Sequence, residues 1–196
     1  MSFQLDGQFA SRILPPPART LLTTASEDIS NAAWGKTGLT VSTGRTGPDG
    51  AAVAEGVFET SANSAHEIQQ DAIVTLVNGT RYLQEAIFKP IGSGRYLLLQ
   101  TFASSFASGA QAYFDFANLR VGYFAHYGAD LVVETAEIYP LAGGYVICRM
   151  YFRATSNNAV DWSYWTFSQT LNANSAYAGD TSKGFDVYRA AIYSVP

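Results

Sequence analysis

The chain has one cysteine, Cys148, and two histidines, His66 and His126, among 196 residues. A single cysteine excludes an internal disulfide and a zinc site made of several cysteines, and a lone thiol in an apolar segment is typical of a small core residue. Neither histidine belongs to a Gly-x-Ser-x-Gly, His-Glu-x-x-His, phosphate-loop or dinucleotide-binding pattern. We therefore expect a protein that is not an enzyme.

Charged residues are scarce as well, at 14% of the chain, and the formal net charge is −4. The basic residues are scattered from Arg12 to Arg189, so the basic patch that nucleic-acid binders use is missing. No apolar run approaches the roughly 20 residues of a membrane-spanning helix. The first residues, Met1 to Asp6, lack the basic and then apolar pattern of a signal peptide. We expect no nucleic-acid partner, no membrane insertion and no export by the usual route.

Aromatic residues are abundant, at 14%, and they recur with Val, Thr and Ile in short runs separated by Gly, Asn, Ser and Asp. This composition is typical of an all-β protein, and the length suits one domain. Ser26 to Ala33 predicts one or two helical turns with Ser26 as the cap, followed by Trp34 in the core. Strands are expected near 37–43, 51–58, 64–71, 80–89, 94–103, 110–116, 132–139, 144–154, 161–170 and 185–194.

The first 19 residues predict an extended arm ahead of a domain over residues 20–196. Pro15, Pro16 and Pro17 favour a polyproline conformation and cannot join the interior of a sheet. Two interpretations stay open: a loosely docked terminus, or an anchor that lies on a neighbouring protein. The anchor is favoured by apolar side chains that a solvated tail would not need, namely Phe3, Leu5, Phe9, Ile13 and Leu14.

The clearest alternation in the chain runs from Tyr145 to Arg153. One face carries Val146, Cys148, Met150 and Phe152, which predicts core, and the other carries Tyr145, Ile147, Arg149, Tyr151 and Arg153. Aromatic rings stack on the apolar face of a sugar, and guanidinium groups donate to its hydroxyls or carboxylates. Candidate sugar contacts in this segment are Arg149, Tyr151 and Arg153.

A second aromatic segment, from Asp161 to Gln169, places a large ring on each face of its strand. The pattern does not decide which face is outside, so Trp162, Tyr164 and Trp165 all stay candidates. The alternative is that these rings only fill the core or a subunit contact. Gln84 and Gln100 are expected on the same polar face as Arg149, as partners for sugar hydroxyls.

Six segments of the chain follow one another in an order and spacing typical of a known domain. They are 21–34 (Leu-Leu-Thr-Thr-Ala-Ser-Glu-Asp-Ile-Ser-Asn-Ala-Ala-Trp), 46–50 (Thr-Gly-Pro-Asp-Gly), 79–83 (Gly-Thr-Arg-Tyr-Leu), 112–118 (Ala-Tyr-Phe-Asp-Phe-Ala-Asn), 143–150 (Gly-Gly-Tyr-Val-Ile-Cys-Arg-Met) and 178–184 (Ala-Gly-Asp-Thr-Ser-Lys-Gly). Nearly everything after residue 20 resembles a jelly-roll β-sandwich similar to concanavalin-like and carbohydrate-binding modules, which is frequent in bacteriophage virion proteins. The resemblance implies an all-β jelly roll with an N-terminal arm.

The same resemblance implies a function on a particle surface. It suggests a fibre or spike protein of a bacteriophage or phage-like particle, released by lysis, that binds host cell-surface polysaccharide. The arm would fasten it to a capsid or tail protein, and a homotrimer is expected because many phage fibres and spikes are threefold. The rival interpretation is a purely structural capsid-decoration, cement or tail-joining protein that binds no sugar.

Two further alternatives concern carboxylates. A polysaccharide-degrading enzyme would use two carboxylates about 5 to 10 Å apart, and candidates within expected strands are Glu85, Asp115, Glu134 and Glu137. Related jelly rolls often hold one structural calcium ion. Loop carboxylates that offer oxygen ligands for it are Glu27, Asp28, Asp49 and Asp180, although no spaced loop of ligands is visible; we expect no other cofactor.

Overall fold

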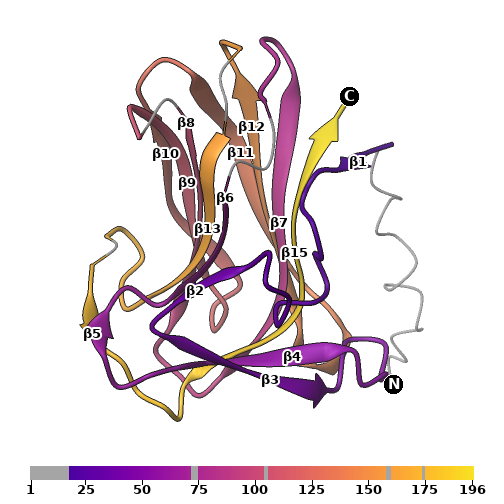
Figure 1. Ribbon diagram of the computed structural model, residues 1–196, viewed down its shortest axis with the longest axis vertical. Helices are drawn as coiled ribbons and strands as arrows, with labels where there is room; N and C mark the ends of the chain where they lie inside the picture. Colours follow the sequence, from indigo (N-terminus) through magenta and orange to yellow (C-terminus); the bar gives the residue numbers. More distant parts are fainter. Residues whose placement is uncertain (1–17, 72–74, 104–105, 158–159, 174) are drawn as a thin grey trace, which may run out of the picture.

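The structure is a computed structural model that describes residues 18–71, 75–103, 106–157, 160–173 and 175–196. Two antiparallel sheets face each other, sheet B on the left and sheet A on the right of Figure 1. Sheet A contains, in spatial order, β11 (Leu131–Pro140), β12 (Val146–Ala154), β7 (Arg81–Ile91), β15 (Gly184–Val195), β4 (Ala54–Glu59) and β3 (Leu39–Arg45), with β1 (Thr20–Leu21) also paired to β15.

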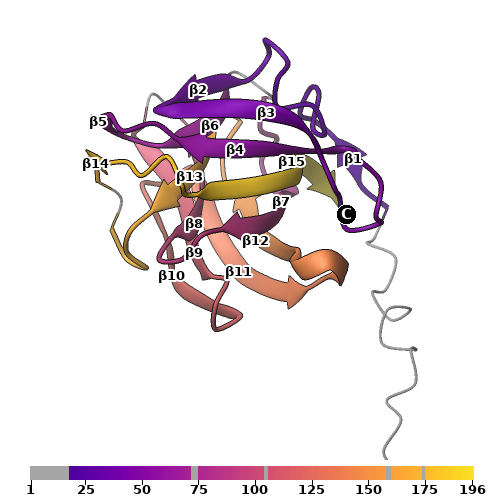
Figure 2. The ribbon, with the colours of Figure 1, turned by 90° about the horizontal axis from the view of Figure 1, so that it is seen from below.

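Sheet B has six strands, and a two-stranded ribbon lies at one end of the sandwich. The order in sheet B is β10 (Arg120–Tyr127), β9 (Ser108–Asp115), β8 (Tyr96–Ala103), β13 (Val160–Ser168), β6 (Glu67–Asp71) and β2 (Gly35–Thr37). The ribbon pairs β5 (Asn63–Ser64) with β14 (Tyr177–Ala178), and a short 3₁₀ helix, η2 (Ala142–Gly144), joins β11 to β12. Figure 2 shows β2, β3 and β4 gathered on one side of the sandwich.

The strand pairing is nested, as in a hairpin that has been rolled up. Of β4, β6, β7, β8, β9, β12, β13 and β15, the first pairs with the last and the second with the second last, and so on inward to the central pair. This nesting defines a jelly roll of eight strands in two sheets. The predicted all-β jelly-roll sandwich is therefore confirmed, with β10 and β11 inserted between the fifth and sixth strands of the roll.

The core lies between the inner faces of the two sheets. β12 alternates as predicted, because Val146, Cys148, Met150 and Phe152 all belong to the buried cluster. Sheet B contributes Trp165, whose ring meets that of Trp34 edge to face with centroids 5.2 Å apart. Trp34 and Cys148 are buried as expected.

The segment from Ser26 to Ala33 is a series of turns, so the predicted helical turns are wrong. Its backbone groups have partners that a helix would exclude: the Trp34 indole donates to the Ala25 carbonyl at 2.9 Å, and Ser30 N donates to Glu55 at 2.9 Å. Ala25 also has a positive φ of 49°. Tertiary contacts therefore override a weak local helix preference.

The ten predicted strands are all present, with shifted ends, and five further strands among the described residues were not predicted as separate strands, namely β1, β2, β5, β10 and β14. β10 is the longest of these, and a register shift between Val121 and Phe124 breaks its alternation. Most of the predicted arm lies outside the described residues. No helix of the part that the structure describes is long and apolar enough to span a membrane.

Candidate functional site

The predicted site residues do not form one site. They occupy three places: the core between the sheets, the outer face of sheet A and the outer face of sheet B. Since neighbouring residues of a strand point to opposite faces, this division follows from the position of each residue along its strand.

Trp165 and Gln84 lie inside the sandwich, and both are fully buried. The Trp165 indole donates to the Glu85 carbonyl at 3.0 Å. Gln84 donates to the Tyr164 carbonyl at 2.9 Å and accepts from Thr101 Oγ1 at 3.0 Å. Placing Gln84 and Gln100 on the face of Arg149 was wrong, because residues 84 and 85 point to opposite sides of β7 and Gln100 lies on β8 of the other sheet. Neither buried side chain is exposed to a ligand.

Arg149, Tyr151 and Arg153 lie on the outer face of sheet A. Arg149 Nε donates to Glu85 Oε2 at 2.9 Å, and Arg153 Nε donates to Glu134 Oε1 at 2.7 Å. The Tyr151 ring is mostly buried in a small apolar cluster with Leu83, Ala191, Tyr193 and Val195. These donors are engaged with carboxylates of neighbouring strands, so the face forms an inter-strand ion-pair network.

Glu85 is at the centre of this network. Its Oε2 accepts from both Arg19 and Arg149 at 2.9 Å, while the guanidinium of Arg19 also lies 3.9 Å from the centroid of the Tyr193 ring. Its Oε1 is buried and has no hydrogen-bond partner in the described part of the protein. Two guanidinium groups on one buried carboxylate tie β12 and the residue before β1 to β7.

The outer face of sheet B holds an aromatic groove. A cavity of about 230 Å³ is lined by Ala65, Glu67, Gln100, Phe102, Phe106 and Tyr164, which we call the aromatic groove. Gln100 and Tyr164 stand opposite each other on β8 and β13, and Trp162 stands opposite Phe102. Trp162, Tyr164 and Gln100 are therefore brought together by the structure, and the outer face of the second aromatic segment is the one with Trp162 and Tyr164.

Ring contacts give the groove its shape. The rings of Phe106 and Trp162 stack with centroids 4.4 Å apart and an interplanar angle of 10°. The centroid of the Phe102 ring lies 5.0 Å from that of Phe106 and 5.6 Å from that of Tyr164. Phe106 is 46% exposed and has a positive φ of 67°. The turn therefore presents the Phe106 ring, stacked on Trp162, as an open apolar platform.

Polar groups adjoin the rings on the floor of the groove. Gln100 Nε2 donates to Gln111 Oε1 at 3.2 Å, and Thr166 Oγ1 donates to Glu67 at 3.2 Å. Burial raises the pKa of Glu67, and burial together with the charges of Glu67 and Asp71 raises the pKa of Tyr164 to about 12. The Tyr164 hydroxyl therefore stays protonated at neutral pH and can act as donor or acceptor.

Sequence reasoning missed Glu67, Phe102 and Phe106. Phe102 follows Gln100 by two residues, so the period of a strand could have placed it on the same face. Phe106 and Glu67 carried no comparable signal, because they reach the groove from a turn and from the neighbouring strand β6.

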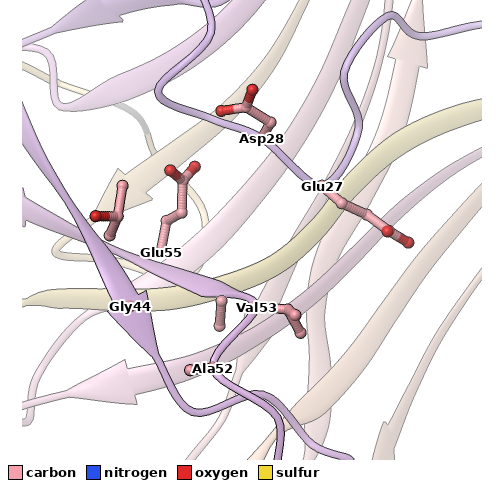
Figure 3. A pocket seen from close by; sticks show the side chains of 8 residues that line it. Glu27, Asp28, Gly44, Ala52, Val53 and Glu55 are labelled. Atoms are coloured by element: carbon pink, nitrogen blue, oxygen red, sulfur yellow. The ribbon is translucent and has the colours of Figure 1, made fainter.

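A second cavity, of about 190 Å³, contains three carboxylates. Asp28 and Glu55 lie along it, and the side chain of Glu27 runs away from them (Figure 3). Asp28 accepts from Ser30 Oγ at 2.6 Å, Glu55 accepts from Ser30 N, and Glu27 pairs with Arg189. In residues 18–196, apart from the undescribed positions, no three His, Cys, Asp or Glu side chains are placed to hold a metal ion.

The strand carboxylates considered for catalysis are divided between the two sheets. Glu85 and Glu134 are paired with Arg149 and Arg81 of sheet A, and Asp115 of sheet B is paired with Arg120 at 2.9 Å. Glu137 of β11 stands opposite Arg149 of β12. None of these four residues lines the aromatic groove, whose carboxylate is Glu67.

No protein-family model and no curated protein sequence matches the chain. Among solved structures, the chain is similar to the CBM22-1 and GH10 modules of endo-1,4-β-D-xylanase 10B of Clostridium thermocellum, determined with xylohexaose, at 10% identity and a TM-score of 0.46. The match covers 91% of this chain and 28% of that chain. The chain thus spans less than a third of its neighbour's length, and its fold assignment rests on its own strand order.

Proposed function

We propose that this protein is a non-catalytic carbohydrate-binding domain whose ligand lies in the aromatic groove of sheet B. The observation that carries the proposal is the exposed stack of Phe106 on Trp162 beside Phe102, with the amide of Gln100 and the hydroxyl of Tyr164 next to it. Rings of this kind pack on the apolar face of a pyranose, and the polar groups fix its hydroxyls.

The groove is more favourable for a sugar than the outer face of sheet A. On sheet A, a ligand that used Arg149 would have to displace Glu85 from a mostly buried ion pair, and removing one partner of a buried pair is costly. Arg153 is already paired with Glu134 in a more exposed pair. In the groove, Gln100 and Glu67 are held only by long hydrogen bonds of 3.2 Å, from Gln100 to Gln111 and from Thr166 to Glu67. A sugar hydroxyl can replace either bond at little cost.

Binding of purified protein to bacterial capsular and surface polysaccharides tests the proposal, with reducing-end release followed in the same wells. Phe106→Ala and Trp162→Ala should each weaken binding about tenfold, which corresponds to about 1.4 kcal/mol. Tyr139→Ala is the matched control, because Tyr139 is also 46% exposed but lies on β11 of sheet A. Unchanged binding in both groove variants would refute the site, and reducing-end release would refute the non-catalytic role.

The finer role that we propose is attachment of a phage or phage-like particle to host polysaccharide, as a homotrimeric fibre or spike on the virion surface. The sequence resemblance supports this role, and the first 19 residues would anchor the domain to a capsid or tail protein. Trimers would also convert weak single-site affinity into stable attachment. Deleting residues 1–19 should abolish particle incorporation and leave glycan binding intact.

A structural cement protein is the second candidate, and exposed apolar side chains on and beside edge strand β10 favour it. Leu119, Tyr123, Phe124 and Tyr127 are each more than 40% exposed, and such a patch is typical of contact with another protein. If no glycan binds and particles without the protein lose stability, this function replaces the first.

A further inference from the structure

Glu67 is half-buried, and its carboxylate, like that of the buried Glu55, differs from three buried carboxylates of the sandwich that are paired with arginines. Glu59, Glu85 and Asp186 each have an arginine partner within 2.9 Å. Glu67 has none in the described part of the chain, and its hydrogen-bond donor there is the neutral hydroxyl of Thr166. Burial raises its pKa, which means that the charged form lacks a compensating cation.

The surroundings of Glu67 attract positive charge. No lysine or arginine is among the residues that line the groove, which include Phe102, Phe106 and Tyr164. The faces of aromatic rings carry negative charge density, and a cation within about 6 Å of a ring centroid is stabilised. A carboxylate beside several rings is the combination that binds an ammonium group.

We propose that the aromatic groove takes an ammonium-bearing sugar, with its cationic nitrogen beside Glu67 and the sugar ring on Phe106 and Phe102. This inference rests on the proposed function and narrows its ligand class from glycans in general to cationic glycans. The volume of about 230 Å³ is below the range of roughly 300 to 1,000 Å³ for drug-sized ligand pockets. The groove therefore suits one sugar unit, with the rest of the chain lying along its open sides.

Anionic glycans are disfavoured by the same geometry. A uronic acid placed in the groove would bring its carboxylate near Glu67 and Asp71, and like charges in a partly desolvated site repel. The arginines of sheet A that could bind such an acid are on the opposite side of the sandwich and are paired.

The test is calorimetric titration of the full chain with three hexamers: glucosamine, N-acetylglucosamine and a neutral glucan. The wild type should bind the glucosamine hexamer about tenfold more tightly than its acetylated counterpart, a difference of about 1.4 kcal/mol. Glu67→Gln should bring the ratio to within about twofold, through a loss of affinity for the glucosamine hexamer. Choline, whose charge is quaternary, forms a separate arm that distinguishes an alkylated ammonium from the primary amine of an amino sugar.

The controls separate a binding role from a structural one. Glu67→Gln should unfold at the same temperature as the wild type or a higher one, because it removes a desolvated charge. Glu137→Gln removes a strand carboxylate from the opposite side of the sandwich and should keep the preference for glucosamine.

The outcomes also separate this inference from the proposed function. Equal affinities for the two amino-sugar hexamers, or a preference that survives in Glu67→Gln, would overturn the inference. If the neutral glucan still binds and Phe106→Ala weakens it, the proposed function stands without the ammonium ligand. If none of the hexamers and no surface polysaccharide binds, both fail.

Discussion

Replacing Arg95 by methionine should destabilise the protein strongly, because it leaves a buried carboxylate without its cation. Arg95 donates to both oxygens of Glu59, at 2.5 and 2.9 Å, and the two side chains are 8% and 0% exposed. Removing one partner of such a pair costs about 3 to 5 kcal/mol. The Tyr177 hydroxyl and Asp180 N also donate to Glu59, at 2.7 and 2.8 Å, so we expect about 3 kcal/mol.

The loss should depend on pH in a defined direction. Burial alone would raise the pKa of Glu59, but the hydrogen bonds and charge of its partners hold it below its ordinary value of 4.5. Stability from this group is therefore fully present above that value and is lost as pH falls through the lower, folded-state pKa. Without Arg95, burial weighs more and the folded-state pKa rises, so the deficit of the variant should shrink between pH 7 and pH 3.

Urea unfolding at several pH values measures both effects. Arg153→Met is the control: the side chains of its ion pair with Glu134 are 45% and 24% exposed, and exposed pairs contribute about 0 to 1 kcal/mol. A deficit for Arg95→Met below about 1 kcal/mol at pH 7, the range of exposed pairs, would refute the argument. So would a deficit that stays constant down to pH 3.

Two further predictions concern the core and the packing of strands. Trp165→Ala should lower the free energy of unfolding by about 3 to 5 kcal/mol, measured by thermal or urea unfolding, because Trp165 is fully buried. Trp162→Ala should cost clearly less. Equal losses would mean that the two faces of β13 are wrongly assigned. Gly184→Ala should destabilise the protein by about 1 to 3 kcal/mol or more, because the new Cβ would lie 2.1 Å from the Val57 carbonyl oxygen. A variant as stable as the wild type would contradict this close contact between β15 and β4.

The strands and the general fold were predictable because they depend on local periodicity. The run from Val146 to Arg153 assigns each residue to a face by itself, and the structure confirms every position of it. The turns of Ser26 to Ala33 were not predictable in this way, because, beside their local turn hydrogen bonds, Ser30 N donates to Glu55 and the Trp34 indole donates to the Ala25 carbonyl. Such partners are set by the tertiary fold.

The site was less predictable than the fold, for a geometric reason. Periodicity separates the two faces of a strand but does not say which face of which sheet two distant strands share. Arg149 and Trp162 both belong to outer faces, yet to opposite sheets. Gln84 and Gln100 have the same chemistry, yet one links the sheets inside the core and the other adjoins the groove.

The distribution of charge between the two outer faces supports the proposed placement of the ligand on sheet B. Both faces combine aromatic rings with polar side chains, and from the sequence they are equivalent. On sheet A the guanidinium groups of Arg149 and Arg153 are already paired with Glu85 and Glu134, although Glu85 Oε1 has no hydrogen-bond partner among the described residues. On sheet B, Glu67 and the ring of Phe106 are left without partners of comparable strength. A face whose polar groups are already paired gains little from a ligand. A carboxylate without a cationic partner can gain an ion pair, and an open ring can gain a stacking contact. This difference is why we propose the ligand site on sheet B.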